Sequence, residues 1–253
     1  MIEQDGQTLE SGSIYFFYRQ FFDEDFSNCS DDIQRFFMVL NPAWNGQYRV
    51  MMLGKKKPRR RRPDSPNMWG IVRRIAANLE QIEIEIDAKS YHTKTRRERL
   101  LKAPRPVGHG LYRIVSRQDD THLVYSLELP SEPSEFVPKD FAIAPEADYI
   151  LKIKNPDRPF PPGIGIEEQP VQYPRQLQML FENRHFSKAE PTELLNYEGT
   201  GVLLSCTEAF AAQQDDVETC FETDDLTPQH FINDLRVQKM QCHPEPLFAG
   251  SKF

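Results

Sequence analysis

IQRFFMVLNPAWNGQYRVMML, residues 33–53, contains two apolar runs on either side of a polar segment. The runs, residues 33–40 and 48–53, are rich in aromatic, aliphatic and β-branched side chains, which favour strands. The segment between them, NPAWNGQ, holds the asparagine, proline and glycine residues that build turns. The stretch therefore predicts a β-hairpin, with Trp44 exposed in its turn.

The run before this hairpin, SIYFFY at residues 13–18, also predicts a strand. Its apolar residues are consecutive rather than alternating, which indicates burial on both faces of a sheet. An exposed aromatic run beside cations would be a platform for stacking nucleic-acid bases. Because so many exposed rings would leave a large apolar patch on the surface, we favour core packing for this run.

The pattern after the hairpin changes twice. Apolar residues spaced by three and four predict a helix over residues 69–79. In residues 82–86 (IEIEI) isoleucine alternates strictly with glutamate, which predicts a half-buried strand with an acidic outer face.

The segment PRPVGHG, residues 104–110, is predicted to break the chain. It would separate a basic β-rich half from a second β-rich half that contains a proline-rich loop. The expected parts are a polar tail (1–12), the two halves (13–105 and 106–206) and a helical or irregular extension (207–253). A single domain over residues 13–206 is the alternative.

Further strands are predicted at residues 111–115, 122–129, 149–153 and 202–206. Residues 155–165 (NPDRPFPPGIG) are too rich in proline for regular structure. Helical segments are predicted at residues 173–186, at 191–195 and after Thr227. About eight short strands and about four short helices, mostly in runs of strands, predict an α+β fold with a mixed or mostly antiparallel sheet or barrel.

The chain has 253 residues, of which 39% are hydrophobic, and this composition excludes a disordered protein. The N-terminus lacks the basic and apolar regions of a secretory signal, and no apolar run is long enough to cross a bilayer. Four scattered cysteines indicate reduced thiols. We therefore expect a cytoplasmic protein that binds no membrane, and a nuclear one if KKKPRRRR at residues 55–62 acts as an import signal in a eukaryotic cell.

The net charge of −7 hides a strong segregation of charge along the chain. Residues 49–117 hold 19 of the 31 lysines and arginines and only six acidic residues, so this span carries +13 and the remainder −20. Seven cations fall within residues 55–62, and Pro58 excludes a regular helix there. We expect an exposed basic loop at this position and a second one at residues 94–105.

These loops favour a non-enzymatic binding or adaptor protein that engages an anionic partner, either nucleic acid or an acidic protein surface. A polycation releases condensed counterions from phosphates, which gives affinity that depends on salt rather than on base sequence. A loop that is merely solvated, or that packs on the chain's own acidic residues, is the alternative. The candidate polyanion-binding residues are Lys55, Lys56, Lys57, Arg59, Arg60, Arg61, Arg62, Arg96, Arg97 and Arg99.

A hydrolytic enzyme is the alternative function, with its site near Gly108 and Gly110 and near the loop of residues 159–165. His109 lies between these two glycines, which would let the backbone approach a ligand closely. His122 would lie beside it if the two strands pair, although ordinary loop histidines explain both residues. No nucleophile elbow, phosphate-binding loop or dinucleotide-binding pattern is present in the sequence, so we expect no cofactor and lean against an enzyme.

Metal-binding residue types gather in the C-terminal fifth, but their spacing is unsuitable for zinc. Zinc ligands usually come in pairs two to four residues apart, and only the last two residues of this set are close, at adjacent positions. We therefore predict no metal site and interpret the thiols as small apolar fillers. The set is Cys206, Cys220, His230, Cys242 and His243.

Several segments resemble those of a family of conserved proteins for which no activity is known. They are GSIYFFYR at residues 12–19, DIQRFFMVLNP at 32–42, THLVYSLELP at 121–130 and ADYILKIKNPDRPFPPGIG from residue 147. The resemblance continues to about residue 205 and implies one evolutionary unit over that length. It implies no catalytic residue, ligand or cofactor.

Overall fold

The computed structural model describes residues 6–20, 33–54, 67–86, 90–93, 96–100, 105–128 and 145–206. The strands are β1 (Gln7–Gln20), β2 (Ile33–Pro42), β3 (Tyr48–Leu53), β4 (Met68–Ala76), β5 (Ser90–Thr93), β6 (Arg96–Leu100), β7 (Arg105–Arg117), β8 (Asp120–Glu128), β9 (Glu146–Lys154), β10 (Phe186–Lys188) and β11 (Gly201–Cys206). The helices are α1 (Leu79–Ile86) and α2 (Arg175–Gln178), with single 3-10 turns η3 (Met179–Phe181) and η4 (Thr192–Asn196).

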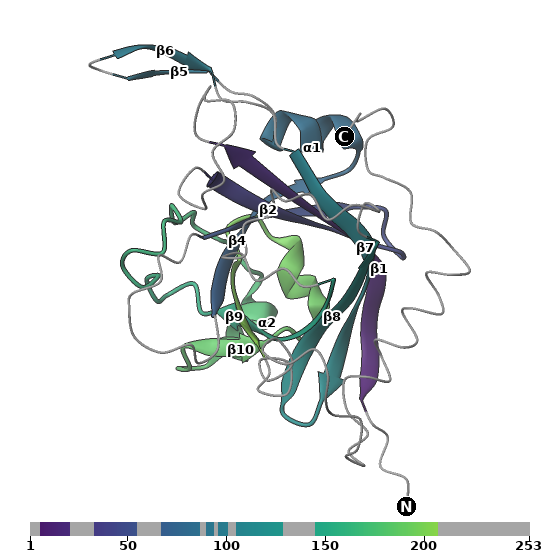
Figure 1. The fold of residues 1–253 in the computed structure, drawn as a ribbon. Helices are drawn as coiled ribbons and strands as arrows, with labels where there is room; N and C mark the ends of the chain where they lie inside the picture. The colour runs from purple at the N-terminus through teal and green to yellow at the C-terminus, as the bar shows by residue number, and fades with distance from the viewer. Residues whose placement is uncertain are drawn as a thin grey trace, which may run out of the picture.

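Eight of the strands close into an antiparallel barrel in the order β9, β11, β4, β3, β2, β1, β7, β8 (Figure 1). The ring closes because β9 pairs with β11 on one side and with β8 on the other. Of the predicted alternatives, a mixed or mostly antiparallel sheet or barrel, the structure is an antiparallel barrel of eight strands, although β1, β2 and β7 are longer than the short strands predicted. The α+β label is only partly matched, because the described helices are few and short and the protein is mostly β.

The strands β1, β2 and β3 are buried on both faces, as their continuous apolar runs predict. Even-numbered residues of β1, such as Phe16, point into the barrel, and odd-numbered ones, such as Phe17, join a second cluster on its outer face. Residues 15–18 are all at most 7% exposed, which confirms core packing for the aromatic run rather than a stacking platform. The predicted hairpin is present, with Leu40 opposite Arg49 and Trp44 62% exposed in the turn.

The helix predicted at residues 69–79 is wrong, because this segment forms β4. A register shift after Val72 places one extra residue in β4, so the alternation of its side chains is interrupted there. Inward-facing Val72 and Ile75 are therefore three residues apart, which imitates helical spacing. Pairing with β3 and β11 makes this segment a strand despite the helical spacing of its apolar residues.

The strand predicted at residues 82–86 is also wrong, because these residues belong to α1. Ile82 and Ile86, four residues apart, pack on the outer face of the barrel, while Ile84 is 56% exposed. Asn78 accepts a hydrogen bond from the backbone N–H of Gln81 at 3.0 Å, which caps the helix start. The spacing of Asn78 and Gln81 is a capping signal that the alternation of isoleucine and glutamate concealed.

Residues 104–110 do not break the chain where they are described, since β7 runs continuously from Arg105 to Arg117. Strands from both sides of this expected boundary pair directly, as in β1 with β7. The predicted strands at 111–115 and 122–129 belong to β7 and β8. They are joined by a tight turn at Gln118, which adopts a positive φ of 45°.

Residues 173–197 contribute side chains to the core inside the barrel. The helix predicted at residues 173–186 is shorter than expected, as α2 and η3 end at Phe181 and β10 begins at Phe186. Tyr173, Phe181 and Leu195 from this segment join the core inside the barrel. The Tyr173 hydroxyl lies 2.8 Å from Thr200 Oγ1, and burial raises the pKa of Tyr173 to about 12.

A charged network lies among these apolar side chains. Both Arg49 Nη atoms donate to the carboxylate of Glu10, with Nη2 2.9 Å from Oε2, and both side chains are fully buried. Arg49 Nε donates to Asn196 Oδ1 at 2.8 Å, and the Tyr112 hydroxyl donates to Glu10 Oε1 at 2.7 Å. The buried polar groups from β1, β3, β7 and η4 therefore have hydrogen-bond partners among themselves.

Burial raises the pKa of Tyr112 well above 10.0, and the adjacent Glu10 carboxylate raises it further. At neutral pH the Tyr112 hydroxyl therefore keeps its proton and donates a hydrogen bond to Glu10. Because the folded protein holds this proton more tightly than the unfolded chain, the contribution to stability is present below pH 10 and decreases as the pH rises above it.

Replacing Glu10 with alanine should leave the Arg49 guanidinium buried without a counter-charge. We expect the free energy of unfolding to fall by about 3–5 kcal/mol in urea denaturation at pH 7, the usual cost of breaking a buried pair. The double variant Glu10→Leu with Arg49→Met should lose less free energy of unfolding, because it leaves no buried charge without a partner. Glu182→Ala is the control, because its pair with Arg184 is exposed and should contribute less than about 1 kcal/mol. A loss in Glu10→Ala no larger than in the control would contradict this role.

Candidate functional site

Several strand ends meet at one end of the barrel. A continuous row of cross-strand partners runs from Gly70 in β4 through Leu53 in β3, Phe36 in β2 and Tyr18 in β1 to Arg105 in β7. The row lies within three residues of the ends of β1 and β3 and of the starts of β2, β4 and β7. We call this end of the barrel, where β1 and β3 finish and β2, β4 and β7 begin, the basic end.

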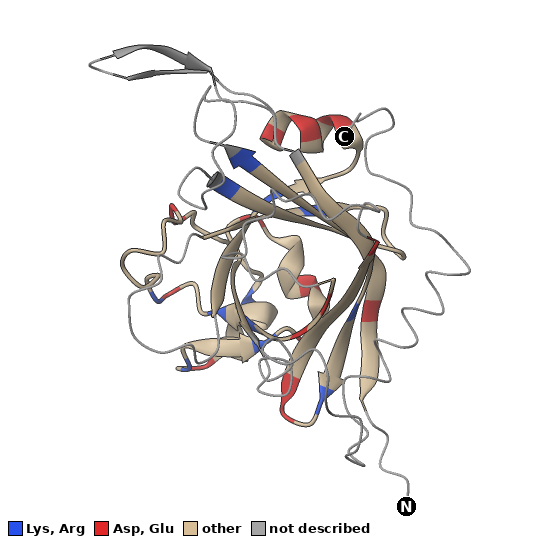
Figure 2. Ribbon diagram, viewed as in Figure 1, with Lys and Arg blue, Asp and Glu red and all other residues tan. Residues whose placement is uncertain are grey.

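Arg19 joins α1 to the basic end. Its Nη2 donates to the carbonyl oxygen of Ile86 at 2.6 Å, and its guanidinium lies 5.3 Å from the centre of the Phe37 ring. Arg19 is only 6% exposed, so its role is structural. Figure 2 shows basic residues at the tips of β1 and β2 beside α1, whose surface is acidic.

Both basic segments of the sequence are attached to this end. Residues 55–62 follow Gly54 directly after β3, but they lie outside the described residues, and with them Lys55, Lys56, Lys57, Arg59, Arg60, Arg61 and Arg62. The second segment lies between the end of α1 and the start of β7. Its expected loop is partly a strand, since β6 pairs with β5 and carries Arg96, Arg97 and Arg99.

The proline-rich segment packs beside the first of these attachments. As predicted, residues 155–165 form no helix or strand. A Cβ added to Gly54 would lie 2.5 Å from the Ile164 carbonyl oxygen, so only glycine permits this close approach. Ile166 and Phe160 pack on the outer apolar cluster of the barrel. The proline-rich segment thus supports β3 at the residue before the basic segment begins.

The two candidate catalytic histidines are far apart. The strands β7 and β8 do pair, but His109 lies opposite Glu128 and His122 lies opposite Val115. Six residue pairs therefore separate them, or about 20 Å at the usual rise of a strand. His109 is in β7 rather than in a loop, and a Cβ on Gly110 would lie 2.1 Å from the Ser126 carbonyl oxygen. That glycine permits close approach of β8, which is a structural reason for it.

His109 has modest contacts. Its Nε2 lies 3.6 Å from the Glu128 carboxylate across the strand pair, and its ring stacks on Tyr15 with 6.4 Å between ring centres. Both side chains are partly exposed, His109 at 24% and Glu128 at 32%. These contacts account for His109 as a residue on the outer face of the barrel.

His122 has a more specific environment. Its Nδ1 lies 2.8 Å from Asp148 Oδ1, and Arg117 Nη1 donates to the other carboxylate oxygen at 3.1 Å. The Asp148 side chain is fully buried, whereas the His122 side chain remains 12% exposed. A buried carboxylate that orients an imidazole through Nδ1 leaves Nε2 available as a proton acceptor. The pairing of β8 with β9 creates this arrangement, and spacing in the sequence does not reveal it.

The described residues contain no group of three histidine, cysteine or acidic side chains able to hold a metal ion. Of the predicted set of metal-binding residue types, Cys206 ends β11 and the other four lie outside the described part of the chain. No helix within the described ranges is long and apolar enough to span a membrane.

The geometry predicts the tautomer of His122. Because the Asp148 carboxylate accepts a hydrogen bond from Nδ1, the neutral ring should carry its proton there. Long-range nitrogen–proton NMR spectra at pH 8 should show a protonated Nδ1 and a bare Nε2. In Asp148→Asn the preference of the His122 proton for Nδ1 should weaken. The nitrogen signals of His109, measured in the same spectra, should not change. A proton on Nε2 of the unaltered protein would exclude the proposed orientation.

Comparison with known proteins supplies no functional assignment: no family model, curated protein or solved structure matches this chain. The resemblance described above therefore stays a prediction. The proposed function rests on the charge of the sequence, the register of the strands and the geometry of the side chains.

Proposed function

We propose that this protein is a non-enzymatic binding protein whose basic end engages nucleic acid through the phosphate backbone. The observation that carries the proposal is the row of cross-strand partners from Gly70 to Arg105, which attaches both basic segments to one end of the barrel. The chain therefore enters residues 55–62 and leaves residues 94–105 at the same end of the barrel. Dense positive charge attracts and holds polyanions.

Eight lysines and arginines elsewhere in the described structure have carboxylate partners, which supports this choice of surface. The pairs, all within 4 Å, are Arg49–Glu10, Arg73–Glu85, Arg74–Glu198, Arg117–Asp148, Lys152–Asp120, Lys154–Glu168, Arg184–Glu182 and Lys188–Glu190. In contrast, residues 55–62 contain no acidic residue and residues 94–105 contain only Glu98. Cations therefore greatly outnumber acidic residues within these two segments.

Acidic segments join the same end of the barrel and offset this charge. Residues 21–32, which connect β1 to β2, hold five aspartate and glutamate residues, and the two basic segments together carry thirteen cations and one glutamate, so these three segments sum to +7. Residues 129–144 and 207–253, which follow β8 and β11, carry −2 and −6, so all five segments sum to −1. The proposed binding therefore depends on the local density of cations in residues 55–62 and 94–105 and not on a net positive charge at this end.

Replacing Arg59, Arg60, Arg61 and Arg62 with alanine should weaken binding to a fluorescent mixed-sequence single-stranded RNA and to a duplex DNA. Each phosphate contact contributes about 0.7 to the logarithmic salt slope for single strands and about 0.9 for duplexes. Losing four contacts should therefore reduce the slope by about three, measured by fluorescence anisotropy between 50 and 300 mM salt.

The matched control removes four cations elsewhere on the surface, Arg74, Lys152, Arg184 and Lys188, which are 37–64% exposed. This variant should bind as the unaltered protein does, once gel filtration has shown that losing Lys152 and Lys188 beside the β9–β10 pairing leaves it in the same oligomeric state. Equal weakening in both variants would show only an effect of net charge and would overturn the proposal. Binding to polyglutamate with no binding to nucleic acid would identify an acidic protein as the partner instead.

A hydrolytic enzyme is the second candidate, and the contact of His122 with Asp148 favours it. An imidazole oriented by a buried carboxylate is suited to take a proton from an attacking water or hydroxyl. The candidate site then centres on His122 rather than on Gly108 and Gly110, which lie in β7.

This second candidate predicts a specific loss of activity. The unaltered protein should hydrolyse p-nitrophenyl acetate faster than buffer does, and His122→Ala and Asp148→Asn should each lower the rate at least tenfold. His109→Ala is the matched control and should keep the rate. If His122→Ala is as active as the unaltered protein, hydrolysis by ordinary surface groups explains the rate and the candidate fails.

A further inference from the structure

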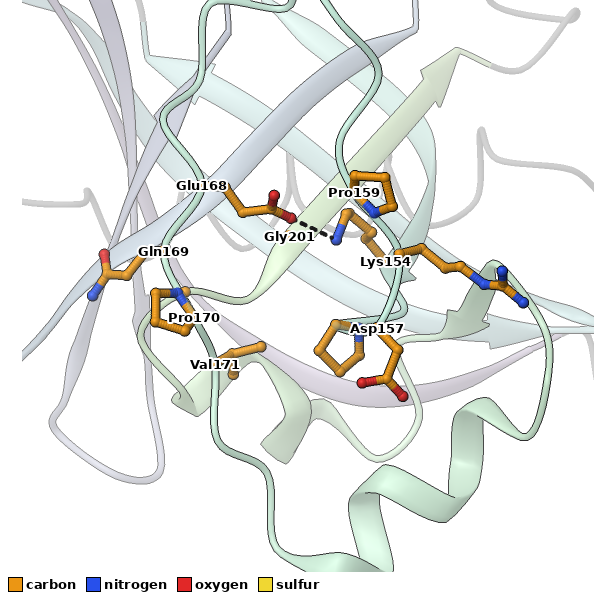
Figure 3. A pocket seen from close by; sticks show the side chains of 11 residues that line it. Lys154, Asp157, Pro159, Glu168, Gln169, Pro170, Val171 and Gly201 are labelled. Atoms are coloured by element: carbon orange, nitrogen blue, oxygen red, sulfur yellow. Dashed lines mark ion pairs between the residues drawn. The ribbon is translucent and has the colours of Figure 1, made fainter.

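A pocket of about 500 Å³ opens on the outer face of the barrel, where β9 ends and β11 begins. Its volume is within the usual range for sites of small molecules. Figure 3 shows the side chains of Lys154 and Glu168 facing each other across it. The rest of the lining has an apolar part, made of Pro156, Pro159, Pro170, Val171, Gly199 and Gly201, and a polar part, made of Asp157, Arg158 and Gln169.

Lys154 is the chemically distinctive residue of the pocket. Its side chain is only 5% exposed, although burying an ammonium group is costly unless partners replace its water. Nζ donates to the backbone oxygen of Asn155 at 3.1 Å and lies 4.7 Å from the centre of the Phe160 ring. Its third partner is Glu168 Oε1 at 3.1 Å. The Asn155 carbonyl is fixed because it directly follows β9. The Phe160 ring is fixed by its packing on Trp69, with 5.5 Å between ring centres.

Glu168, the third partner, is held much less firmly. Its side chain is 47% exposed, and it lies in a segment without helix or strand. The Glu168 carboxylate forms an ion pair with Lys154. If Glu168 turned away, its carboxylate would be hydrated, whereas Lys154 would be left buried with a vacant donor. The pair is therefore asymmetric, and another carboxylate could take the place of Glu168.

Two glycines allow the rest of the pocket to pack closely. A Cβ on Gly201 would lie 2.7 Å from Phe160 Cζ and 3.1 Å from Lys154 Cβ, so glycine is needed for these two side chains to pack. Gly199 has a φ of 90°, and its Cβ would lie 2.8 Å from the Gln169 carbonyl oxygen. The three proline rings have little conformational freedom to lose on binding.

We propose that this pocket binds a small organic monocarboxylate, which displaces Glu168 from Lys154 and places its apolar part against the prolines and Val171. A carboxylate is favoured because the present occupant of the Lys154 site is one. Asp157 and Arg158 also line the pocket, and their opposite charges offset each other. Once Glu168 is displaced, the lining has the single positive charge of Lys154 in excess, which matches a monocarboxylate better than a phosphate dianion. This site goes beyond the proposed binding of nucleic acid, since neither basic segment contributes to its lining.

Benzoate is the probe for the first experiment, with inorganic phosphate as the comparison. Backbone amide shifts on adding benzoate should concentrate at residues 154–159, 168–171 and 199–201, and phosphate should leave them unchanged. Because Glu168 competes within the molecule at an effective concentration in the millimolar range or higher, Glu168→Gln should bind benzoate at least tenfold more tightly by calorimetry.

Two variants complete the design. Glu167→Gln removes the same charge from the neighbouring exposed residue, which does not line the pocket, and should leave the affinity unchanged. Lys154→Met should abolish binding, and adding Glu168→Gln should not restore it. Unchanged affinity in Glu168→Gln, equal gains in both glutamine variants, or shifts located elsewhere would each overturn the proposal, even if Lys154→Met failed to fold.

Discussion

The ion pair of Glu10 with Arg49 is the constraint around which the barrel is arranged. It connects β1 to β3, and through Tyr112 and Asn196 it also connects β7 and the turn η4. An apolar core of the same volume could be at least as stable, but it would tolerate shifts in strand register. A two-pronged contact between fully buried charges does not tolerate them, because a shift of one residue would turn one charge toward the outer face. The network therefore favours one arrangement of strands over its near neighbours.

The filled interior restricts where function is to be sought. Large side chains such as Phe16, Tyr125 and Met38 are almost fully buried inside the barrel, and residues 173–197 add their own side chains to it. Much of the outer face is also covered, by α1 over β1–β4 and by the proline-rich segment. Within the described residues, the features that remain for binding are the barrel end to which the basic segments attach, the pocket beside β9, and the contact of His122 with Asp148. The first two lie where irregular segments meet the ends of strands, which is common for functional sites.

Local signals predicted those parts of the fold in which neighbours in sequence are also neighbours in space. The hairpin of β2 and β3 follows from NPAWNGQ, and the pairing of β7 with β8 follows from the polar turn after Arg117. Prediction failed where contacts with distant residues decide the structure. The bulge in β4 spaces its inward-facing residues as in a helix, and the sequence of α1 alternates as in a strand. The same limit applies to the sites. The contact of His122 with Asp148 and that of Lys154 with Glu168 depend on strand pairing and on packing of an irregular segment, so spacing in the sequence could not reveal them.

The double pairing of β9 also affects how the folded chain meets other copies of itself. Residues 146–150 of β9 pair with β8, so the ring closes over only part of the strand, and the backbone groups of its last residues would remain open on that side. The short strand β10 pairs there instead, with Phe186 opposite Lys154 and Lys188 opposite Lys152. An open strand edge is a template for adding a strand from another molecule, which is how many β proteins begin to aggregate. Three residues of β10, with lysines on both sides of the pairing, thus protect the seam of the barrel against self-association.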